Sequence, residues 1–356
     1  MGLRMKVMRM SGFLSSIGTH RTVAAVIAIT AMAPALVSSQ DPPRIRIYLN
    51  GFPVTCLCMS KDMRYIAAVR EDNLAIWDVA RQKKLFERDV PFNGDLSSYI
   101  TSIDFSGADP VLSDFSGRIL SFSLASREFT ALRAFPANPE FHTSQLFGAG
   151  SAFAYLDPKG VLSLCPVTDG AANKLGAVGS RKCGGVAVSP DGSTLAVDEE
   201  DGVHVIDVAG DREIAQIPDC GIEGGLFDCP VFSENGDEMI ARTNDDRLLL
   251  WRKRIGIVIQ TLAIPDHSFL IAISPDGKYI AVSGQPYAEI WEVGKDGSVR
   301  RPAYRLGRVS RTRYLRGFYS CLAFSPDSRT LLMGYRISGG VKVWKFAKGK
   351  SFDLGS

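Results

Sequence analysis

The four tryptophans of this chain occupy the same place in a repeated phrase, and this repetition limits what the chain can fold into. Each lies in a short apolar segment, such as AIWDV or AEIWEV. Each also follows, by 17 to 19 residues, a serine in a second phrase such as AISPDGKYIAV. Such self-similarity indicates a repeat architecture, not one conventional core. The pairs are Ser60 with Trp77, Ser233 with Trp251, Ser274 with Trp291, and Ser325 with Trp344.

Three further copies have another residue at the tryptophan position. They run from Ser106 to Phe122, from Gly148 to Cys165 and from Ser189 to Ile206. The seven units recur at intervals of 40 to 53 residues. We expect seven equivalent structural positions, namely Trp77, Phe122, Cys165, Ile206, Trp251, Trp291 and Trp344.

Each unit reads as four short strands separated by turn signals. In the sixth unit, FLIAIS and KYIAVSG flank the turn PDG, and AEIWEV follows. Proline presets φ at the second turn position, and glycine accepts a positive φ. Strand-rich repeats of about 40–45 residues with a late tryptophan are typical of propeller blades. We therefore predict an all-β, seven-bladed β-propeller of four-stranded blades, in which the late aromatic residue fills the wedge between neighbouring sheets.

These phrases resemble the repeats of WD-repeat propellers. The resemblance rests on SPDG at 189–192 and 274–277, SPDS at 325–328 and IWDV at 76–79, and it covers residues 44–347. Two features depart from that family. No Gly-His pair opens a repeat, and an aspartate follows the tryptophan position only at Asp78 and Asp207. The resemblance implies a scaffold that presents a surface or a channel mouth to a protein partner.

The seventh unit supplies only three strands before a polar tail. The segment RIRIYL at 44–49 alternates strictly and has no sheet of its own. A propeller removes its open edges when one terminus completes the last blade. We predict that 44–49 closes the ring as an N-terminal strand, with SFDL in the tail as the second candidate.

Residues 1–39 read as a targeting segment. A basic stretch without acidic residues precedes an apolar run at 23–37, which Pro34 interrupts. The run is short for a membrane span of about 20 residues and ends in small residues suited to cleavage. We predict a cleaved signal peptide before Gln40 and a secreted or periplasmic protein, with 40–356 as a single propeller domain. An uncleaved N-terminal membrane anchor and a transit peptide are the alternatives.

The net positive charge of the chain comes from residues 1–39. Residues 1–39 hold four of the 41 basic residues and none of the 38 acidic ones, so the remainder is nearly neutral. A near-neutral body argues for neither nucleic acid nor a membrane surface as a partner.

The seven cysteines all follow residue 39, and an odd number cannot pair completely within one chain. Most are interpreted as small buried thiols, because free cysteine is commonly buried. Cys220 and Cys229 flank a glycine-rich loop and form the candidate disulfide of an exported protein.

The sequence contains no recognised catalytic, cofactor or metal motif. The chain contains no GxSxG, HExxH, CxxC or GxxxxGK[ST] phrase. Beyond residues 1–39, histidine occurs only at His142, His204 and His267, without the spacing of metal ligands. We interpret His204 as a hydrogen-bonded strand residue and the acidic run at 198–201 as a solvated turn. The predicted protein is not an enzyme and needs no cofactor.

One segment between units six and seven has a distinctive composition. No acidic residue occurs between Asp296 and Asp327, whereas 300–316 contains seven arginines with two tyrosines interleaved among them. Arginine with tyrosine is the composition of interface hot spots and of anion recognition. The segment is expected to form the longest connection in the ring, and the alternative to a binding role is a mobile loop or a solvated strand extension. The candidate partner-binding residues are Arg300, Arg301, Tyr304, Arg305, Arg308, Arg311, Arg313, Tyr314 and Arg316.

The leading hypothesis is an exported, non-enzymatic, monomeric ring that binds a protein partner. The arginine-rich segment favours an acidic partner, because arginine pairs with carboxylate. One rival is a propeller enzyme, or a redox or metal protein, with a site on the central axis. Asp104 is the main inner-strand carboxylate available to such a site. The second rival is an envelope component held in the membrane by an uncleaved N-terminus.

Overall fold

The computed structural model describes most of the chain after residue 53. Residues 1–39 and 44–49 therefore lie outside the described residues, and the predicted place of 44–49 is judged from the strand that occupies it. The described range is 54–354 without 71, 92–99, 115–116, 135–143, 148–149, 157–161, 169–172, 176–182, 200, 218–229, 243–246, 255, 264–269, 284–287, 307–318 and 336–339.

Twenty-eight strands form seven sheets of four, and every sheet is built from strands that are consecutive in the chain. Blade 1 contains β1 (Val54–Met59), β2 (Tyr65–Arg70), β3 (Asn73–Asp78) and β4 (Lys83–Asp89). Blade 2 contains β5 (Ile100–Ser106), β6 (Asp109–Asp114), β7 (Arg118–Phe122) and β8 (Phe129–Ala134). Blade 3 contains β9 (Ser144–Phe147), β10 (Ala152–Leu156), β11 (Leu162–Pro166) and β12 (Asn173–Leu175). Blade 4 contains β13 (Cys183–Val188), β14 (Thr194–Glu199), β15 (Gly202–Asp207) and β16 (Arg212–Ile217).

The last three blades follow the same order. Blade 5 contains β17 (Val231–Phe232), β18 (Glu238–Arg242), β19 (Arg247–Arg252) and β20 (Ile257–Ala263). Blade 6 contains β21 (Leu270–Ile273), β22 (Tyr279–Ser283), β23 (Ala288–Val293) and β24 (Val299–Leu306). Blade 7 contains β25 (Tyr319–Phe324), β26 (Leu331–Tyr335), β27 (Val341–Lys345), the 3-10 helix η2 (Phe346–Lys348) and β28 (Lys350–Leu354). No helix among the described residues is long and apolar enough to cross a membrane.

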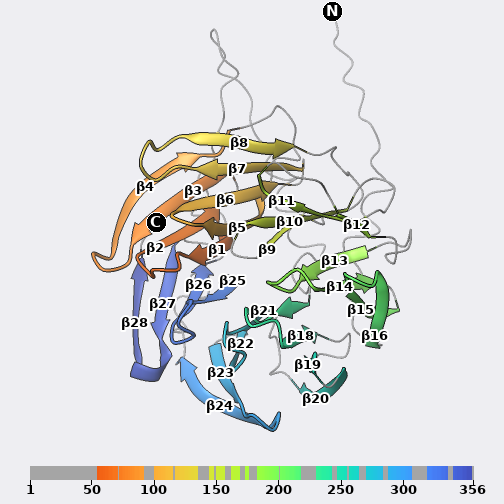
Figure 1. Cartoon of the computed structure of the whole chain (residues 1–356). Helices are drawn as coiled ribbons and strands as arrows, with labels where there is room; N and C mark the ends of the chain where they lie inside the picture. Colours follow the sequence, from red (N-terminus) through yellow and green to blue (C-terminus); the bar gives the residue numbers. More distant parts are fainter. Residues whose placement is uncertain are drawn as a thin grey trace, which may run out of the picture.

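The blades stand side by side around a ring (Figure 1). All strand pairs within a blade are antiparallel, and the first strand of each blade lies on the inside. Each inner strand contacts the inner strand of the next blade, and β1 of blade 1 contacts β25 of blade 7. The predicted seven-bladed, all-β propeller is confirmed.

The recurring Ser-x-Asp phrase builds the turn between the first and second strands of a blade. In blade 6, the hydroxyl of Ser274 donates to Asp276 Oδ1 at 2.8 Å and accepts the backbone N–H of Tyr279 at 2.9 Å. The glycine of the phrase, Gly277, has φ of 71°, in the left-handed region that favours glycine. The turn expected from PDG is therefore present. The same serine contacts recur at Ser60, Ser189, Ser233 and Ser325.

The tryptophan positions fill the wedges between blades, as predicted. Each lies in the third strand of its blade, and each is no more than 3% exposed. Trp251 of blade 5 packs with residues of blade 4, such as Ala196 and Val205. Trp77 of blade 1 packs in the same way with Leu332 and other residues of blade 7. The wedge residue of a blade thus contacts the preceding blade.

Blade 3 fills its wedge differently, because the equivalent residue is the small Cys165, which is 2% exposed. Two aromatic rings from the second strand of the blade fill this wedge instead. Phe153 and Tyr155 belong to the cluster between blades 2 and 3, with ring centroids 6.3 Å apart and nearly parallel planes. The second strand therefore supplies the aromatic area that the third strand lacks.

The last blade corrects the prediction for ring closure. The outer strand of blade 7 is β28, which pairs with β27 from Lys345↔Lys350 to Val341↔Leu354. Gly349, with φ of 62°, ends η2 and lets the chain reverse into this hairpin. The C-terminal tail thus completes the blade, and the role assigned to 44–49 was wrong. The short loop makes the hairpin partner local, so no distant strand is needed.

Candidate functional site

The arginine-rich segment begins in a strand and not in a loop. β24, the outer strand of blade 6, carries Arg300, Arg301, Tyr304 and Arg305. It pairs with β23 along its length, with a bulge between Ile290 and Glu292. The expectation of one long connection is therefore wrong for the first half of the segment. The strand fixes these side chains along the outer edge of the blade.

Arg305 joins a network that the sequence did not reveal. Its Nε lies 2.9 Å from Oε1 of Glu289, the residue opposite it in β23. The other carboxylate oxygen of Glu289 accepts the indole N–H of Trp291 at 3.0 Å. The Glu289 side chain is 5% exposed and that of Arg305 is 53% exposed. Arg305 therefore neutralises a buried carboxylate while part of its guanidinium remains in solvent.

Arg300 and Arg301 are also held by contacts within the described structure. Arg300 Nη2 lies 3.1 Å from Oε2 of Glu292, and the Arg300 side chain is 67% exposed. Arg301 Nη1 donates to the carbonyl of Ala263 at 2.9 Å, and its guanidinium lies 5.4 Å from the centre of the Trp291 ring. Since a guanidinium has five N–H donors, both side chains keep donors for a further acceptor.

Tyr304 faces the neighbouring blade. Its ring centroid lies 5.2 Å from that of Phe346, and it packs against the cluster between blades 6 and 7. The tyrosine is therefore half-buried and anchors β24. The remaining candidates of the segment lie outside the described residues, namely Arg308, Arg311, Arg313, Tyr314 and Arg316.

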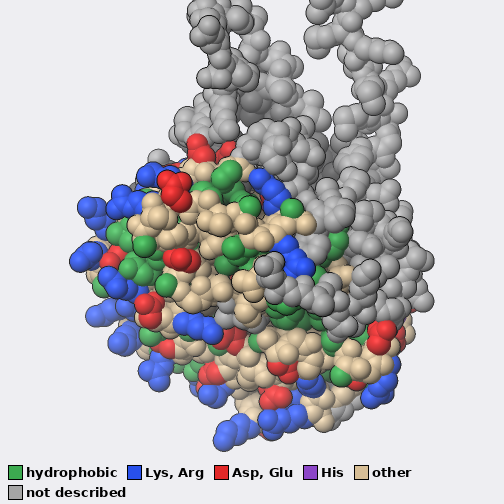
Figure 2. All heavy atoms as spheres, turned by 45° about the horizontal axis from the view of Figure 1, so that its top comes forward, with side chains coloured by type: hydrophobic (Ala, Val, Ile, Leu, Met, Phe, Trp, Pro, Cys, Tyr) green, Lys and Arg blue, Asp and Glu red, His purple; other side chains and the backbone are tan. Residues whose placement is uncertain are grey.

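Other basic side chains form a second charged region. Lys and Arg side chains gather along the left edge of the face in Figure 2, with fewer acidic side chains between them. In Figure 1, β4 and β28 lie on that side of the ring. The exposed basic residues of these elements include Lys83, Arg88 and Lys350. Among the described residues, basic side chains are therefore not confined to the arginine-rich segment.

The described cysteines are thiols in apolar surroundings. Cys56, Cys58, Cys165 and Cys321 are free, and burial raises the pKa of each, to about 12 for Cys56. A thiol with a raised pKa holds its proton and is a poor nucleophile and metal ligand. This fits the interpretation of packing thiols. The candidate disulfide between Cys220 and Cys229 lies outside the described residues.

Asp104 is the inner-strand carboxyl on which an axial site would depend. Burial, and to a lesser extent the nearby charge of Glu234, raise its pKa to about 6. Hydrogen bonds from the backbone of Phe105 and Gly150 and the charge of Lys61 act in the opposite direction. Gly150 belongs to the turn of blade 3, so Asp104 points across the joint between blades 2 and 3.

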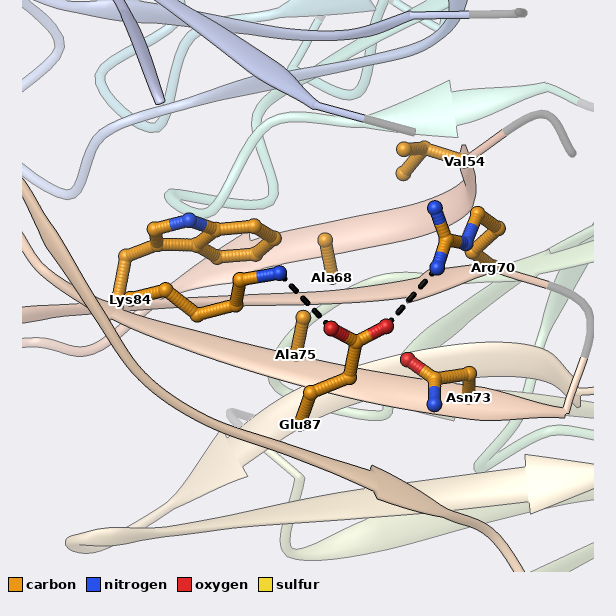
Figure 3. A pocket seen from close by; sticks show the side chains of 8 residues that line it. Val54, Ala68, Arg70, Asn73, Ala75, Lys84 and Glu87 are labelled. Atoms are coloured by element: carbon orange, nitrogen blue, oxygen red, sulfur yellow. Dashed lines mark hydrogen bonds and ion pairs between the residues drawn. The ribbon is translucent and has the colours of Figure 1, made fainter. Parts of the chain in front are cut away.

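A small pocket lies on the face of blade 1 that packs toward blade 7 (Figure 3). Trp77 and the small residues Val54, Ala68 and Ala75 line its apolar side. At its polar side, Figure 3 shows Glu87 between two cations, with Lys84 Nζ and Arg70 Nη2 each 2.8 Å from a carboxylate oxygen. The pocket has room for roughly one water molecule. Small-molecule sites measure about 300–1,000 Å³, so this pocket is too small for a cofactor.

His204 lies in the third strand of blade 4 between two carboxylates. Its Nδ1 is 2.8 Å from Glu213 Oε2 in β16, and its Nε2 is 2.8 Å from Asp201 Oδ1 in the turn before β15. Burial lowers the pKa of the imidazole, but hydrogen bonds to Glu213 and Asp201 outweigh this effect and raise it above the usual 6.5. The expected hydrogen-bonded strand histidine is thus present, with charged partners.

The acidic run beside His204 is only partly a solvated turn. Glu199 ends β14 and is 7% exposed, whereas the side chain of Asp201 is 51% exposed. One carboxylate oxygen each of Glu199 and Asp201 and a ring nitrogen of His204 lie within 4.8 Å of one another. Both ring nitrogens are already engaged by carboxylates, so the arrangement fits a protonated imidazole. The expectation of a fully solvated run was wrong for Glu199, because strand β14 turns it onto the packed face.

Four-stranded blades, serine-capped turns and buried third-strand aromatic residues together define a WD-repeat-like β-propeller. Among solved structures, the chain is similar to the β-propeller domain of Cps50 (Swd1) from Myceliophteria thermophila, with a TM-score of 0.60 and 17% identity. The match covers 85% of this chain and 99% of that domain. At this identity the likeness concerns the fold alone. No protein-family model and no curated protein matches the chain.

Proposed function

We propose that this chain is an exported, non-enzymatic scaffold that binds an acidic protein partner through the arginine-rich edge of blade 6. The observation that carries the proposal is the display of Arg300 and Arg301 on β24. Both guanidinium groups are held in place by one or two contacts and are exposed. A group that is ordered before binding loses less conformational entropy when a carboxylate arrives.

The fold supports this proposal in general terms, since a propeller presents broad surfaces built on a rigid ring. Arginine pairs with carboxylate through two parallel hydrogen bonds, which gives specificity for an acidic surface. Arg305 is better assigned to the blade itself, because it neutralises the buried Glu289. The contact set therefore begins with Arg300 and Arg301 and continues into the segment after 306.

The experiment measures binding of a labelled poly-glutamate peptide to the purified protein and to the variant Arg300→Gln/Arg301→Gln. We expect weaker binding by the variant, and weaker binding by the wild type as salt is raised. The matched control is Arg212→Gln/Arg254→Gln, which removes two exposed, singly paired guanidinium groups from blades 4 and 5. Equal loss in both variants would show only a dependence on total charge, and no loss in the first would refute the proposal.

Export is tested separately. Mass spectrometry of the mature protein should find a new N-terminus near Gln40 if residues 1–39 are a cleaved signal. An intact N-terminus in a membrane fraction would favour the anchored form, and one in the cytosol would refute export.

A further inference from the structure

The hydrogen-bond partners of His204 in blade 4 favour the protonated form of its imidazole. A neutral imidazole has one N–H and one lone pair, whereas the imidazolium has two N–H donors. Here both nitrogens face carboxylate oxygens at 2.8 Å. Only the imidazolium can donate to both, and the neutral ring would direct a lone pair at one carboxylate.

The residues around this ring make the local charge negative. Glu199 of β14 acts on His204 from the same sheet, in addition to Asp201 and Glu213. Asp201 Oδ2 also accepts the side-chain amide of Gln216 in β16 at 3.1 Å. The face of blade 4 that packs on blade 3 meets Ala154, Leu162 and Leu164, none of which can titrate.

Besides the strand ladder and the hydrogen bond between Gln216 and Asp201, the imidazole is a link between the β14–β15 turn and the outer strand β16. Asp201 belongs to the turn between β14 and β15, and Glu213 and Gln216 belong to β16, the outer strand. The ladder between β15 and β16 is interrupted by a bulge between Val205 and Ile206, next to His204. A side-chain link at this point therefore holds an edge where the backbone pairing is irregular.

We propose that His204 is a proton-dependent link: its imidazolium ties the β14–β15 turn to the outer strand β16, and loss of the proton loosens this edge of blade 4, where the hydrogen bond between Gln216 and Asp201 remains. The device requires no ligand or partner and is independent of the binding surface on blade 6. The direction of the pH dependence follows from the charges, because the positive imidazolium attracts the two carboxylates and the neutral ring does not. The link is closed at low pH, and it opens as pH rises through the pKa of His204 in the folded protein.

The test is a pH titration of the imidazole signals of the full chain by nuclear magnetic resonance with ¹⁵N-histidine. His204→Gln identifies the signal of His204 among those of the four histidines. We expect the midpoint of His204 above 6.5, and we expect Glu213→Gln and Asp201→Asn each to move it to lower pH. The control Asp237→Asn, which removes a carboxylate paired with Arg254 in blade 5, should leave the midpoint unchanged.

Hydrogen exchange provides the second readout. After correction for the intrinsic effect of pH, amide protection in β16 should fall about tenfold in the wild type as pH rises through the midpoint. His204→Gln should lack this step while remaining folded. A midpoint at or below 6.5, a midpoint insensitive to both carboxylate variants, or a wild type without the exchange step would each overturn the proposal.

Discussion

The indole N–H of Trp291 donates to the buried carboxylate of Glu289 at 3.0 Å, and this contact distinguishes blade 6 from blade 5. Trp251 occupies the equivalent place in blade 5 and is as deeply buried. Its indole nitrogen is buried without a hydrogen-bond partner among the described residues. The residue two positions before it is Leu249, where blade 6 has glutamate. Two tryptophans with the same packing role thus differ in their polar chemistry.

This difference predicts unequal costs for the same substitution. Trp291→Phe removes the donor to Glu289, whereas Trp251→Phe removes a nitrogen that has no described partner. We expect Trp291→Phe to lower the free energy of unfolding by about 1–2 kcal/mol more than Trp251→Phe. Denaturant unfolding of both variants measures it. Equal losses would mean that volume alone decides the cost.

Removing the whole wedge residue should be more severe. Trp251→Ala leaves a cavity between blades 4 and 5, and the free energy of unfolding should fall by roughly 3–5 kcal/mol. Cys165→Ala is the comparison, because Phe153 and Tyr155 fill that wedge instead. Its cost should be much smaller. A large cost for Cys165→Ala would contradict the compensation in blade 3.

Arg305 should affect stability, although it lies in the candidate binding segment. Arg305→Gln removes the positive partner of Glu289, whose side chain is 5% exposed. Because the Arg305 side chain is half exposed and its charge is screened, we expect a modest loss of about 1–3 kcal/mol in the free energy of unfolding. Arg300→Gln should change it little, since the Arg300–Glu292 pair is largely solvated. Thermal unfolding of the two variants compares them, and equal melting temperatures would contradict this assignment.

The outer strand of blade 7 gives a prediction about truncation. Deleting 350–356 removes β28 and Leu354, which belongs to the core between blades 7 and 1. We expect a lower melting temperature and aggregation through the exposed edge of β27. Deleting 44–49 should have the smaller effect, because β28 already occupies the outer position. A larger effect from the N-terminal deletion would reverse this ranking.

Asp104 predicts a pH dependence of stability. Its pKa is about 6 in the folded protein and has the ordinary value of 3.8 when unfolded. The folded state therefore holds the proton more strongly, so the contribution of Asp104 to stability decreases as pH rises from about 4 to 6. The decrease should be about 3 kcal/mol. Subtracting the profile of Asp104→Asn isolates it, and a difference that is flat or increases with pH would contradict the prediction.

The repeat itself predicted the fold, because its period, turn residues and late aromatic residue all describe the same local unit. Trp77 and its equivalents are buried in the third strand because strand alternation and wedge geometry are local properties. The fourth strand of blade 7 was less predictable. RIRIYL has the clearer alternating pattern, but SFDL follows a tight turn, and proximity in the chain decided the pairing.

The contacts at the candidate site could not be predicted from amino-acid composition. The arginine count of 300–316 says nothing about Glu289, whose position opposite Arg305 follows from strand register. His204 likewise showed its carboxylate partners only once β15 and β16 were paired. The one available signal was the acidic run at 198–201, which ends three residues before His204. The sequence therefore indicated which segments carry charged residues. Strand pairing was needed to show which of these residues form ion pairs within the blades.

Closure by β28 makes the seventh joint mechanically distinct. Six joints between blades are bridged by the polypeptide, whereas blades 7 and 1 are joined by packing and by contacts such as that of Cys321 Sγ with the carbonyl of Val54 at 3.3 Å. Among the described strands, each blade consists of four strands that are consecutive in the chain. The described ring is therefore a row of complete blades in which the last blade packs on the first. Under tension applied to its two ends, this joint is where the ring should part first.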